Sequence, residues 1–460
     1  MEISNGSQKY VSLPLNPHPM EGESPPTAAP EPRESVDIGN APQGRLAGRP
    51  VFPQPTGLPA SAPQGTEGTE AKTDGPSEVR RPVPPEPPAF PADEGAHPGV
   101  KTEWWYVNGH LKDSDGRRFG FHEALFDTPD VISGRYNIDL PGMPGATMLD
   151  TAFLELDAKA HTQKRILHLH MPGADHPGLS EGKLDNRFDS PMGEWQLRRI
   201  DPSTIELDKP LPDGKLHLTL REKKAPLMMG GQGEIPMGPK GLSKYYTHSS
   251  LKAEGTITRN GKTLDIKGSV WMDHQWGDMS MFDPWKGWDW FGIQLDGGRQ
   301  LNAFNFRNED GTSLQTTLGI SNPDGTQEHL DEFTVKPGGH WESPVTGACY
   351  PLEWTIEIPA KKATLHVKAY HKKQEVPGNW PYTSKYLSAM PTYWEGACKV
   401  TGTFEDKPVK GKAYMELLGY EERKDDGEKA VAEARKLVAA AESHDPSAEM
   451  LFSGGNRQQG

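Results

Sequence analysis

The sequence has little cysteine and no long apolar run. Two cysteines, Cys349 and Cys398, are too few for a disulfide scaffold or a cysteine-ligated zinc site, so we expect free thiols, although one bridge remains open. No apolar stretch is long enough to cross a bilayer, and the N-terminus lacks the basic and apolar regions of a signal peptide. These absences favour a cytoplasmic protein without a membrane segment.

Basic charge is also scarce. Asp and Glu number 64 against 50 Lys and Arg, a formal net charge of -14, which argues against nucleic acid or an anionic membrane as partner. No GxSxG elbow, P-loop or GxGxxG motif is present, so serine hydrolase and nucleotide chemistry lack their machinery and we expect no cofactor. His168 and His170 fall on one face of a predicted strand, but spacing fixes no third ligand, so we expect no metal site.

Proline is abundant but unevenly placed. Of the 44 prolines, 20 lie before Asp93. Residues 1–92 mix Pro, Gly, Ser and Glu without apolar periodicity, which predicts a disordered tail. The run VRRPVPPEPPAFP is able to form a polyproline helix that docks on a partner, and a plain spacer is the alternative interpretation.

After the tail, the pattern becomes that of an all-β protein. TEWWYVNGHL and RRFGFHEALF flank Asp115-Gly116, and LKAEGTIT and KTLDIKGSVWMD flank Asn260-Gly261, which predicts hairpins. Similar turn signals recur to Tyr420, which favours barrels or sandwiches. We expect β domains at 93–284 and 285–422. A stripe of Ala, Val and Leu then predicts one helix near 427–443, within a C-terminal segment 423–460 that ends in a frayed tail.

The stretch Gly268–Asp296 is the richest in tryptophan, with five of the twelve. Strand alternation puts Trp271 and Asp273 on one face and His274 on the other, and it places Trp288 and Trp290 together. An acid beside large indole surfaces has a raised pKa when it is buried without a partner, which suits proton transfer. The alternative is that the indoles only pack the core and that backbone amides bind Asp273.

Other polar residues are weaker candidates. Glu103 shares a face with Trp105 and is either a second acid or an arginine partner. His122 is either a ligand contact or a satisfied core histidine. Tyr245 and Tyr246 either donate hydrogen bonds to a ligand or brace packing, and Asp289 and Glu395 are similar cases.

Five ordered blocks resemble one known family. PADEGAHPGVKTEWWYVNGHL, KAPLMMGGQGEIPMGPKGLSKYYTHSSLKAEGTI, GSVWMDHQWGD, GWDWFGIQLDGG and YWEGACKVTGTFEDKPVKGKAYMELLGY resemble the AttH-like proteins related to carotenoid 1,2-hydratase. The resemblance implies two consecutive lipocalin-like antiparallel β-barrels that handle apolar small molecules of secondary metabolism, of isoprenoid or polyketide type. It also implies hydratase, cyclase or hydrolase relatives, and hydration without a redox cofactor.

The resemblance also implies residue roles. Asp273 matches the proton donor of the hydratase, with Trp271 upstream and His274 following. We therefore expect acid-assisted hydration, isomerisation or cyclisation inside a closed barrel; a non-catalytic lipocalin-like carrier or an AttH-type hydrolase is the alternative. The continuation Gln275-Trp276-Gly277 is closer to AttH, so a carotenoid substrate is not implied. The predicted catalytic residues are Asp273, His274 and Glu103, and the predicted substrate-binding residues are Trp105, His122, Tyr246, Trp271, Trp276, Trp288 and Trp290.

Overall fold

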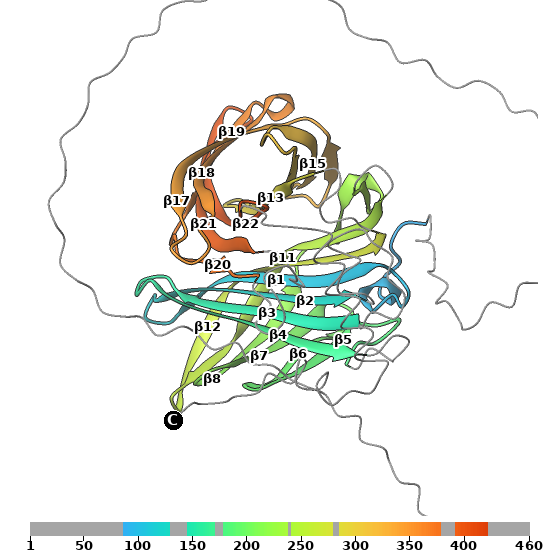
Figure 1. Cartoon of the computed structure of the whole chain (residues 1–460), viewed down its shortest axis with the longest axis vertical. Helices are drawn as coiled ribbons and strands as arrows, with labels where there is room; N and C mark the ends of the chain where they lie inside the picture. Colours follow the sequence, from blue (N-terminus) through green and yellow to red (C-terminus); the bar gives the residue numbers. More distant parts are fainter. Residues whose placement is uncertain are drawn as a thin grey trace, which may run out of the picture. The chain divides into compact units, whose positions relative to one another are not determined.

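A computed structural model describes residues 86–128, 145–170, 178–237, 241–278, 285–378 and 392–421. Apart from residues 86–92, the predicted tail lies outside these residues, and so does the helix predicted near 427–443. The described residues all belong to one unit of the chain. They form two curled antiparallel sheets, which Figure 1 shows coloured from blue to yellow-green and from yellow to red.

The first sheet contains twelve strands in the described residues, with the path β4-β3-β2-β1-β12-β11-β8-β7-β6-β5 and two short strands, β9 and β10, paired to β11. A short helix, η1 (Ala92–Glu94), precedes it. The strands are β1 (Thr102–Asp113), β2 (Arg118–Thr128), β3 (Gly145–Glu155), β4 (Ala160–His170), β5 (Asp185–Ser190), β6 (Gly193–Asp201), β7 (Thr204–Leu211), β8 (Gly214–Glu222), β9 (Leu227–Met228), β10 (Glu234–Pro236), β11 (Leu242–Arg259) and β12 (Lys262–Asp278).

The second sheet contains ten strands in the described part of the chain, with the path β16-β15-β14-β13-β22-β21-β19-β18-β17 and the short β20 paired to β21. The strands are β13 (Gly287–Leu295), β14 (Gln300–Arg307), β15 (Ser313–Ser321), β16 (Gln327–Leu330), β17 (Thr334–Glu342), β18 (Cys349–Ile358), β19 (Ala363–Ala369), β20 (Glu375–Val376), β21 (Tyr393–Phe404) and β22 (Lys407–Leu418), with η3 (Pro359–Lys361) between β18 and β19.

The turn chemistry of the sequence sets both predicted hairpins. Asp115-Gly116 joins β1 to β2, and Asn260-Gly261 joins β11 to β12. Asn260 and Gly261 both have positive φ angles, 48° and 74°, as a two-residue hairpin turn with the right twist requires. Asparagine and glycine tolerate this conformation, so these turns fix the register of the longest strand pair.

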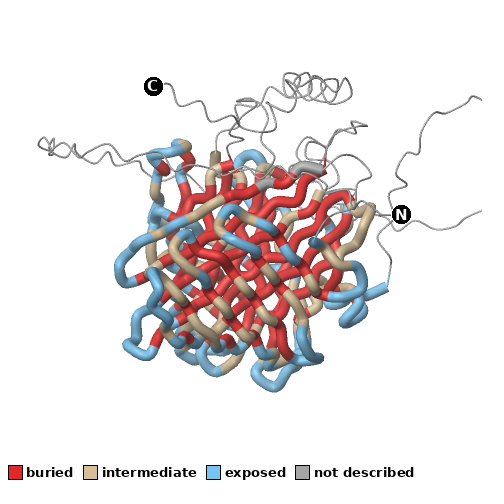
Figure 2. Tube along the Cα trace, turned by 90° about the horizontal axis from the view of Figure 1, so that it is seen from below, coloured by how far each residue is buried: buried red, intermediate tan, exposed pale blue. Residues whose placement is uncertain are grey.

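Strand alternation sorts the apolar side chains into three clusters. One fills the inside of the first sheet around Trp105, Trp195 and Met272, and one fills the inside of the second sheet around Phe291 and Trp394. The third contains residues of both sheets, among them Trp104 and Trp271 from the first and Trp288 and Trp290 from the second. In Figure 2 the buried positions accordingly follow the strands, and the exposed positions gather at the turns.

The segment between β8 and β11, a long Gly- and Pro-rich loop in the sequence, joins the two sheets. It contains β9, η2 (Met229–Gly231) and β10. Lys224 Nζ donates hydrogen bonds to the carbonyl oxygens of Gly298 at 2.6 Å and Asn322 at 2.5 Å, and the backbone N–H of Met228 donates to Gln327 at 3.0 Å. This segment of the first sheet is therefore bound to the β14–β16 edge of the second.

The predicted all-β fold of two lipocalin-like units is confirmed, with one difference of detail. The path of each sheet ends in two edge strands, β4 and β5 in the first and β16 and β17 in the second. The strand pairing within each curled sheet therefore does not close into a complete barrel. Both cysteines are free, as expected, with Cys349 exposed and Cys398 buried. None of the helices in the described residues is both long and apolar enough to cross a bilayer.

Candidate functional site

The tryptophan-rich segment contributes to both sheets, because β12 belongs to the first and β13 to the second. Trp271 Nε1 donates a hydrogen bond to Asp273 Oδ1 at 2.7 Å, so these side chains share a face, as alternation predicts. Trp290 packs edge-on against Trp271 with ring centroids 5.9 Å apart. The face of β12 that carries Asp273 is therefore turned towards β13.

A pocket lies between this face of the first sheet and the face of the second sheet that carries Trp290. It holds about 580 Å³ of empty space, including its opening to solvent. Aromatic side chains dominate its wall, and Asp273 and Glu416 are its acidic members. The lining residues are Trp104, Tyr106, Ala124, Phe126, Tyr245, Asp273 and Gln275 from the first sheet and Trp288, Trp290, Phe304, Tyr393, Glu416 and Leu418 from the second.

Strand register explains why these residues meet. In the first sheet, Asp273 of β12 lies between Tyr106 of β1 and Thr247 of β11. In the second, Glu416 of β22 lies between Glu395 of β21 and Trp290 of β13. Residues paired across strands point to the same face, so each sheet presents one polar and aromatic row to the other.

Asp273 is held by donors on both carboxyl oxygens and is only 3% exposed. Oδ1 accepts hydrogen bonds from Trp271 Nε1 and from the Thr247 hydroxyl, and Oδ2 accepts one from the Tyr245 hydroxyl at 2.9 Å. Tyr245 in turn accepts hydrogen bonds from Asn302 Nδ2 at 2.6 Å and Trp290 Nε1 at 3.0 Å. The carboxyl group is thereby fixed by residues of both sheets.

Burial decides the protonation of Asp273. Removal from water raises its pKa well above the ordinary value, and the hydrogen bonds from Tyr245 and Trp271 only partly oppose this. The buried environment therefore favours the protonated form of this carboxyl group.

Glu416 and Glu395 form a second acidic pair on the opposite wall. They are directly opposite one another on β22 and β21. Burial raises the pKa of Glu416 to about 7, while Trp288 Nε1 donates to it at 3.1 Å. Burial raises the pKa of Glu395 well above its ordinary value, and the charge of Glu416 raises it further. Like charges opposite one another are unfavourable, so ionisation of Glu416 disfavours ionisation of Glu395.

Two tyrosines connect this wall to the first sheet. The Tyr106 hydroxyl donates to Glu395 Oε1 at 2.5 Å, and the Tyr393 hydroxyl donates to Asp150 Oδ2 at 2.8 Å. Asp150 also accepts two hydrogen bonds from Arg165, both at 2.6 Å. Because these bonds join the two sheets, the shape of the pocket depends on how the sheets are docked.

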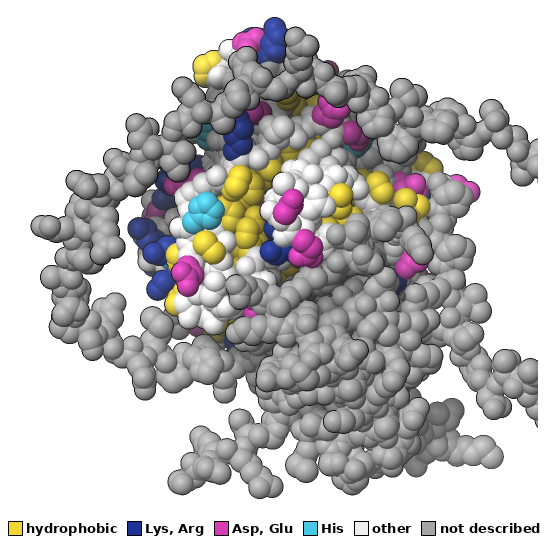
Figure 3. Space-filling model, turned by 45° about the horizontal axis from the view of Figure 1, so that its top comes forward, with side chains coloured by type: hydrophobic (Ala, Val, Ile, Leu, Met, Phe, Trp, Pro, Cys, Tyr) yellow, Lys and Arg dark blue, Asp and Glu magenta, His cyan; other side chains and the backbone are white. Residues whose placement is uncertain are grey.

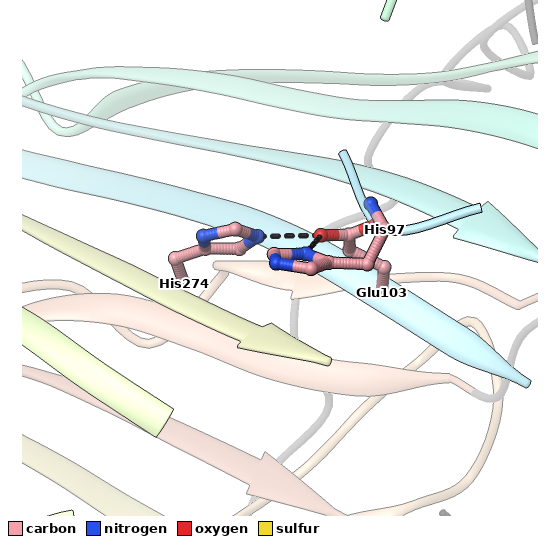
Figure 4. A group of neighbouring side chains, drawn as sticks. All are labelled: His97, Glu103 and His274. Carbon is pink, nitrogen blue, oxygen red and sulfur yellow. Dashed lines mark hydrogen bonds and ion pairs between the residues drawn. The ribbon is translucent and has the colours of Figure 1, made fainter. Parts of the chain in front are cut away.

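A separate polar cluster lies on the other face of the same strands. His97 Nδ1 and His274 Nε2 each lie 2.7 Å from Glu103 Oε1 (Figure 4). Trp276 stacks on the His97 ring at 4.1 Å and Trp105 stacks on the His274 ring at 4.6 Å. Burial opposes the charge on Glu103, but the hydrogen bonds with the two histidines outweigh it and lower the Glu103 pKa.

Charged side chains of both signs lie on the surface of the described residues. On the face shown in Figure 3, acidic and basic side chains of the described residues are interspersed beside hydrophobic ones.

Comparison with known proteins places the chain in a family. The sequence profile described as AttH-like matches residues 81–420. This chain belongs to the AttH-like family. The resemblance to this family that the sequence motifs indicated is thus confirmed over residues 81–420 of the chain.

Several relatives of this AttH-like protein are known. An AttH-type protein of Nitrosomonas europaea is 26% identical, has a TM-score of 0.62, and is matched over 99% of its chain and 74% of this one. Kievitone hydratase of Nectria haematococca has a TM-score of 0.56 at 18% identity, over 93% and 72% of the two chains, which shows a shared fold.

A further relative was found by sequence similarity. The dehydratase asqC of Emericella nidulans is 22% identical over 225 residues, which are 47% of this chain and 61% of the dehydratase. The AttH-like chain therefore spans about three fifths of that relative's length.

The structure brings together only part of the predicted site. Asp273, Trp288 and Trp290 line the pocket, and Trp271 binds Asp273 from behind. The His122 ring lies 6.4 Å from those of the pocket tyrosines Tyr106 and Tyr393, and no hydrogen-bond partner for its Nε2 occurs among the described residues. The remaining predicted residues, Glu103, Trp105, Tyr246, His274 and Trp276, lie on the inner face of the first sheet around the His97 cluster.

Strand geometry is the reason for this separation. Trp105, His274 and Tyr246 are register partners in β1, β12 and β11, one residue out of step with Tyr106, Asp273 and Thr247. A shift of one residue reverses the face. Asp273 accordingly lies between the two sheets rather than inside one barrel.

Some site residues were missed in the sequence. Glu416 and Tyr106 were not singled out, and Glu395 was one weak candidate among several. The available signal was alternation, because Tyr414 and Glu416 share a face in the otherwise apolar YMELL of β22. Alternation does not reveal which face of β22 contacts the first sheet, because this contact depends on the tertiary structure.

Proposed function

We propose that this AttH-like protein is a cofactor-independent enzyme that adds water to, or removes it from, an apolar small molecule held between the two sheets. The observation that carries the proposal is Asp273, a buried carboxyl group of raised pKa in the wall of an aromatic pocket. The dehydratase asqC, whose sequence is similar over 225 residues, supports the reaction class.

The hydrogen bonds around Asp273 indicate which oxygen carries the proton. Oδ1 accepts two hydrogen bonds, from Trp271 and Thr247, and these occupy both of its lone pairs. Oδ2 accepts one, from Tyr245, and retains one lone pair. The acidic proton is therefore assigned to Oδ2, and Tyr245 orients this oxygen.

In the hydration direction, Asp273 transfers its proton to one carbon of a carbon–carbon double bond. The π electrons form the new C–H bond, and the other carbon becomes a cation. Trp288 and Trp290 line the same pocket, and an indole face stabilises a desolvated cation by about 2 kcal/mol. A water molecule then attacks the cation and releases a proton.

Glu416 is the group assigned to accept the released proton. It lines the pocket on the wall opposite Asp273, and its pKa of about 7 suits a general base near neutral pH. Dehydration is the same sequence in reverse, in which Glu416 delivers the proton to the leaving hydroxyl and Asp273 accepts one from carbon. Loss of a different proton from the cation gives isomerisation, and attack by a second double bond gives cyclisation.

The apolar wall also favours a second function, that of a ligand carrier. A carrier needs the aromatic lining for affinity but makes no use of a raised carboxyl pKa. The proton donor thus distinguishes the two functions.

The test uses purified protein and a panel of isoprenoid and polyketide alkenes and tertiary alcohols. Mass spectrometry in isotopically labelled water detects the gain or loss of one water. Asp273→Asn should lower the turnover number by at least about 100-fold, because general acid catalysis contributes about that much. Binding, measured by quenching of tryptophan fluorescence, should persist.

Asp265→Asn is the matched control, since Asp265 is an exposed residue of the same strand. Turnover by Asp273→Asn equal to that of the control would remove Asp273 from the mechanism. Panel members that bind but are never converted would instead support the carrier.

A further inference from the structure

The cluster of His97, Glu103 and His274 has more acceptors than its neutral histidines can satisfy. Both ring nitrogens of His274 lie beside acceptors, Nε2 beside Glu103 Oε1 at 2.7 Å and Nδ1 beside the Asp93 carbonyl oxygen at 3.1 Å, and the Tyr246 hydroxyl also lies 3.1 Å from Nδ1. The same holds for His97, whose Nδ1 lies 2.7 Å from Glu103 Oε1 and whose Nε2 lies 3.4 Å from Asp93 Oδ1. Two neutral imidazoles supply two N–H groups for four such places, so the cluster is suited to a cation.

The three inner atoms are arranged as metal ligands. His97 Nδ1, His274 Nε2 and one Glu103 oxygen all lie within 4.8 Å of one another. Two imidazoles and one carboxylate form a common ligand set for divalent transition metals. In a tetrahedral site with bonds of about 2.1 Å the ligand atoms lie roughly 3.4 Å apart, so each imidazole nitrogen, now 2.7 Å from Glu103 Oε1, would move about 0.7 Å away from it.

The outer contacts follow the pattern of metal-bound histidines. Such a histidine directs its other ring nitrogen at a carbonyl or carboxylate oxygen, which fixes the tautomer that leaves the inner nitrogen free to bind. His274 has the Asp93 carbonyl in this position, and His97 has the Asp93 carboxylate. The second oxygen of Glu103 accepts the His97 backbone N–H at 2.8 Å, which fixes the carboxylate.

We propose that His97 Nδ1, His274 Nε2 and Glu103 Oε1 bind a divalent transition metal of the zinc type. The ion joins the segment before β1, which carries His97, to β1 and β12. His97 is partly exposed, with 19% of its side chain accessible, and provides the route of entry. Trp105 and Trp276 hold the two imidazole rings in place.

A second group of similar composition is less suited to an ion. Glu94, Glu222 and His248 also converge in the described residues. Arg199, however, forms ion pairs with both Glu94 and Glu222. Its guanidinium already neutralises this group, whereas the ion pairs of Glu103 in the described residues involve only the two histidines.

The experiment titrates chelator-treated protein with Zn²⁺ by calorimetry and with Co²⁺ by visible absorption, whose intensity reports coordination. The wild type should bind one ion per chain and unfold at a higher temperature when Zn²⁺ is present, because a ligand of the folded state stabilises it. Glu103→Gln should lose at least tenfold in affinity and lose the thermal shift. Glu222→Gln is the matched control and should behave as the wild type.

His97→Gln covers the case in which Glu103→Gln fails to fold, since His97 is the most exposed of the three ligands. Equal Co²⁺ affinity of the wild type and of the folded His97 or Glu103 variant would overturn the proposal. A loss confined to Glu222→Gln would place the ion at the Arg199 group instead. Absence of binding to the wild type would show that protons alone balance the cluster, which also overturns it.

Discussion

At the scale of single residues, neighbouring positions of one strand face different environments. Asp273 and His274 are adjacent in β12, yet the first lines the pocket between the sheets and the second binds Glu103 on the inner face. The same holds for Tyr245, which donates to Asp273, and Tyr246, which lies 3.1 Å from His274. Chemistry on the two faces is thus separable by single substitutions.

The raised pKa of Glu416 predicts how stability depends on pH. Its pKa is 4.5 in the unfolded chain and about 7 in the folded protein, so between these values only the folded state holds the proton. Stability contributed by this proton is complete below pH 4.5 and is lost as pH rises to about 7. The loss is on the order of 3 kcal/mol.

Glu416→Gln removes this titration while it retains the size of the side chain. The difference in free energy of unfolding between wild type and Glu416→Gln, measured by denaturant titration across this range, should therefore fall with rising pH. Glu309→Gln, at an exposed turn position, is the control and should show a constant difference. A constant difference for Glu416→Gln as well would mean that Glu416 titrates normally.

Much of the residue-level prediction follows from alternation alone. The pairing of Trp271 with Asp273 and of Trp288 with Trp290 is confirmed, because a strand allows two faces only. The predicted catalytic set grouped Glu103 and His274 with Asp273. Alternation did not support this grouping, because it assigns His274 to the other face. The roles assigned to these residues remain predictions.

At the scale of elements, β13 of the second sheet packs closely against Trp271 of the first. A Cβ added at Gly292 would lie 2.5 Å from the Trp290 ring and 3.2 Å from the Trp271 ring. Aromatic rings in a buried cluster have little room to move, so glycine is required at this point of the strand.

Gly292→Ala should therefore destabilise the protein by about 1–3 kcal/mol, as overpacking does, and weaken ligand binding through displaced Trp290. Thermal unfolding and fluorescence quenching measure the two effects. Gly338→Ala in β17 is the control, because the nearest atom to an added Cβ there lies 3.8 Å away. Equal stability of the two variants would show that the rings adjust without cost.

The elements themselves were largely predictable. Hairpins at Asp115-Gly116 and Asn260-Gly261 are confirmed because the turn residues specify the backbone conformation. The short strands β9 and β10 were not predictable, since strands of two and three residues leave no periodic signal in the sequence. Their pairing with β11 is set by tertiary contact.

At the scale of the whole molecule, Lys224 connects the two sheets. Its ammonium group donates to Gly298, Gln300 and Asn322 of the second sheet at 2.5 to 2.8 Å. Lys224→Met keeps the apolar stem but removes these donors and leaves carbonyl groups without them. We expect a loss of about 1–3 kcal/mol in the free energy of unfolding.

Hydrogen exchange locates the effect of this substitution. Protection should fall at the β14–β16 edge in Lys224→Met and should be unchanged in Lys223→Met, whose side chain is exposed. Unaltered exchange at this edge in both variants would show that other contacts suffice to dock the sheets.

The position of the site was the least predictable feature. Each sheet is specified by nearby turns and alternation, and the family resemblance identified both units correctly. The docking of one sheet on the other depends on contacts such as Tyr106 with Glu395, which are 289 residues apart in the chain. No local pattern encodes such a pair. The pocket was therefore expected inside one barrel, but it lies between the two sheets.

A pocket built by both halves of the chain has a consequence for how such proteins diversify. Asp273 and its direct donors all come from β11 and β12, whereas much of the aromatic wall comes from the second sheet. An exchange of residues 285–421 with a relative would thus change the shape of the ligand-binding wall and leave Asp273, the proposed proton donor, in place. Under the proposed mechanism, the proton donor would be inherited with the first sheet, and most of the ligand-binding wall together with the base Glu416 would be inherited with the second.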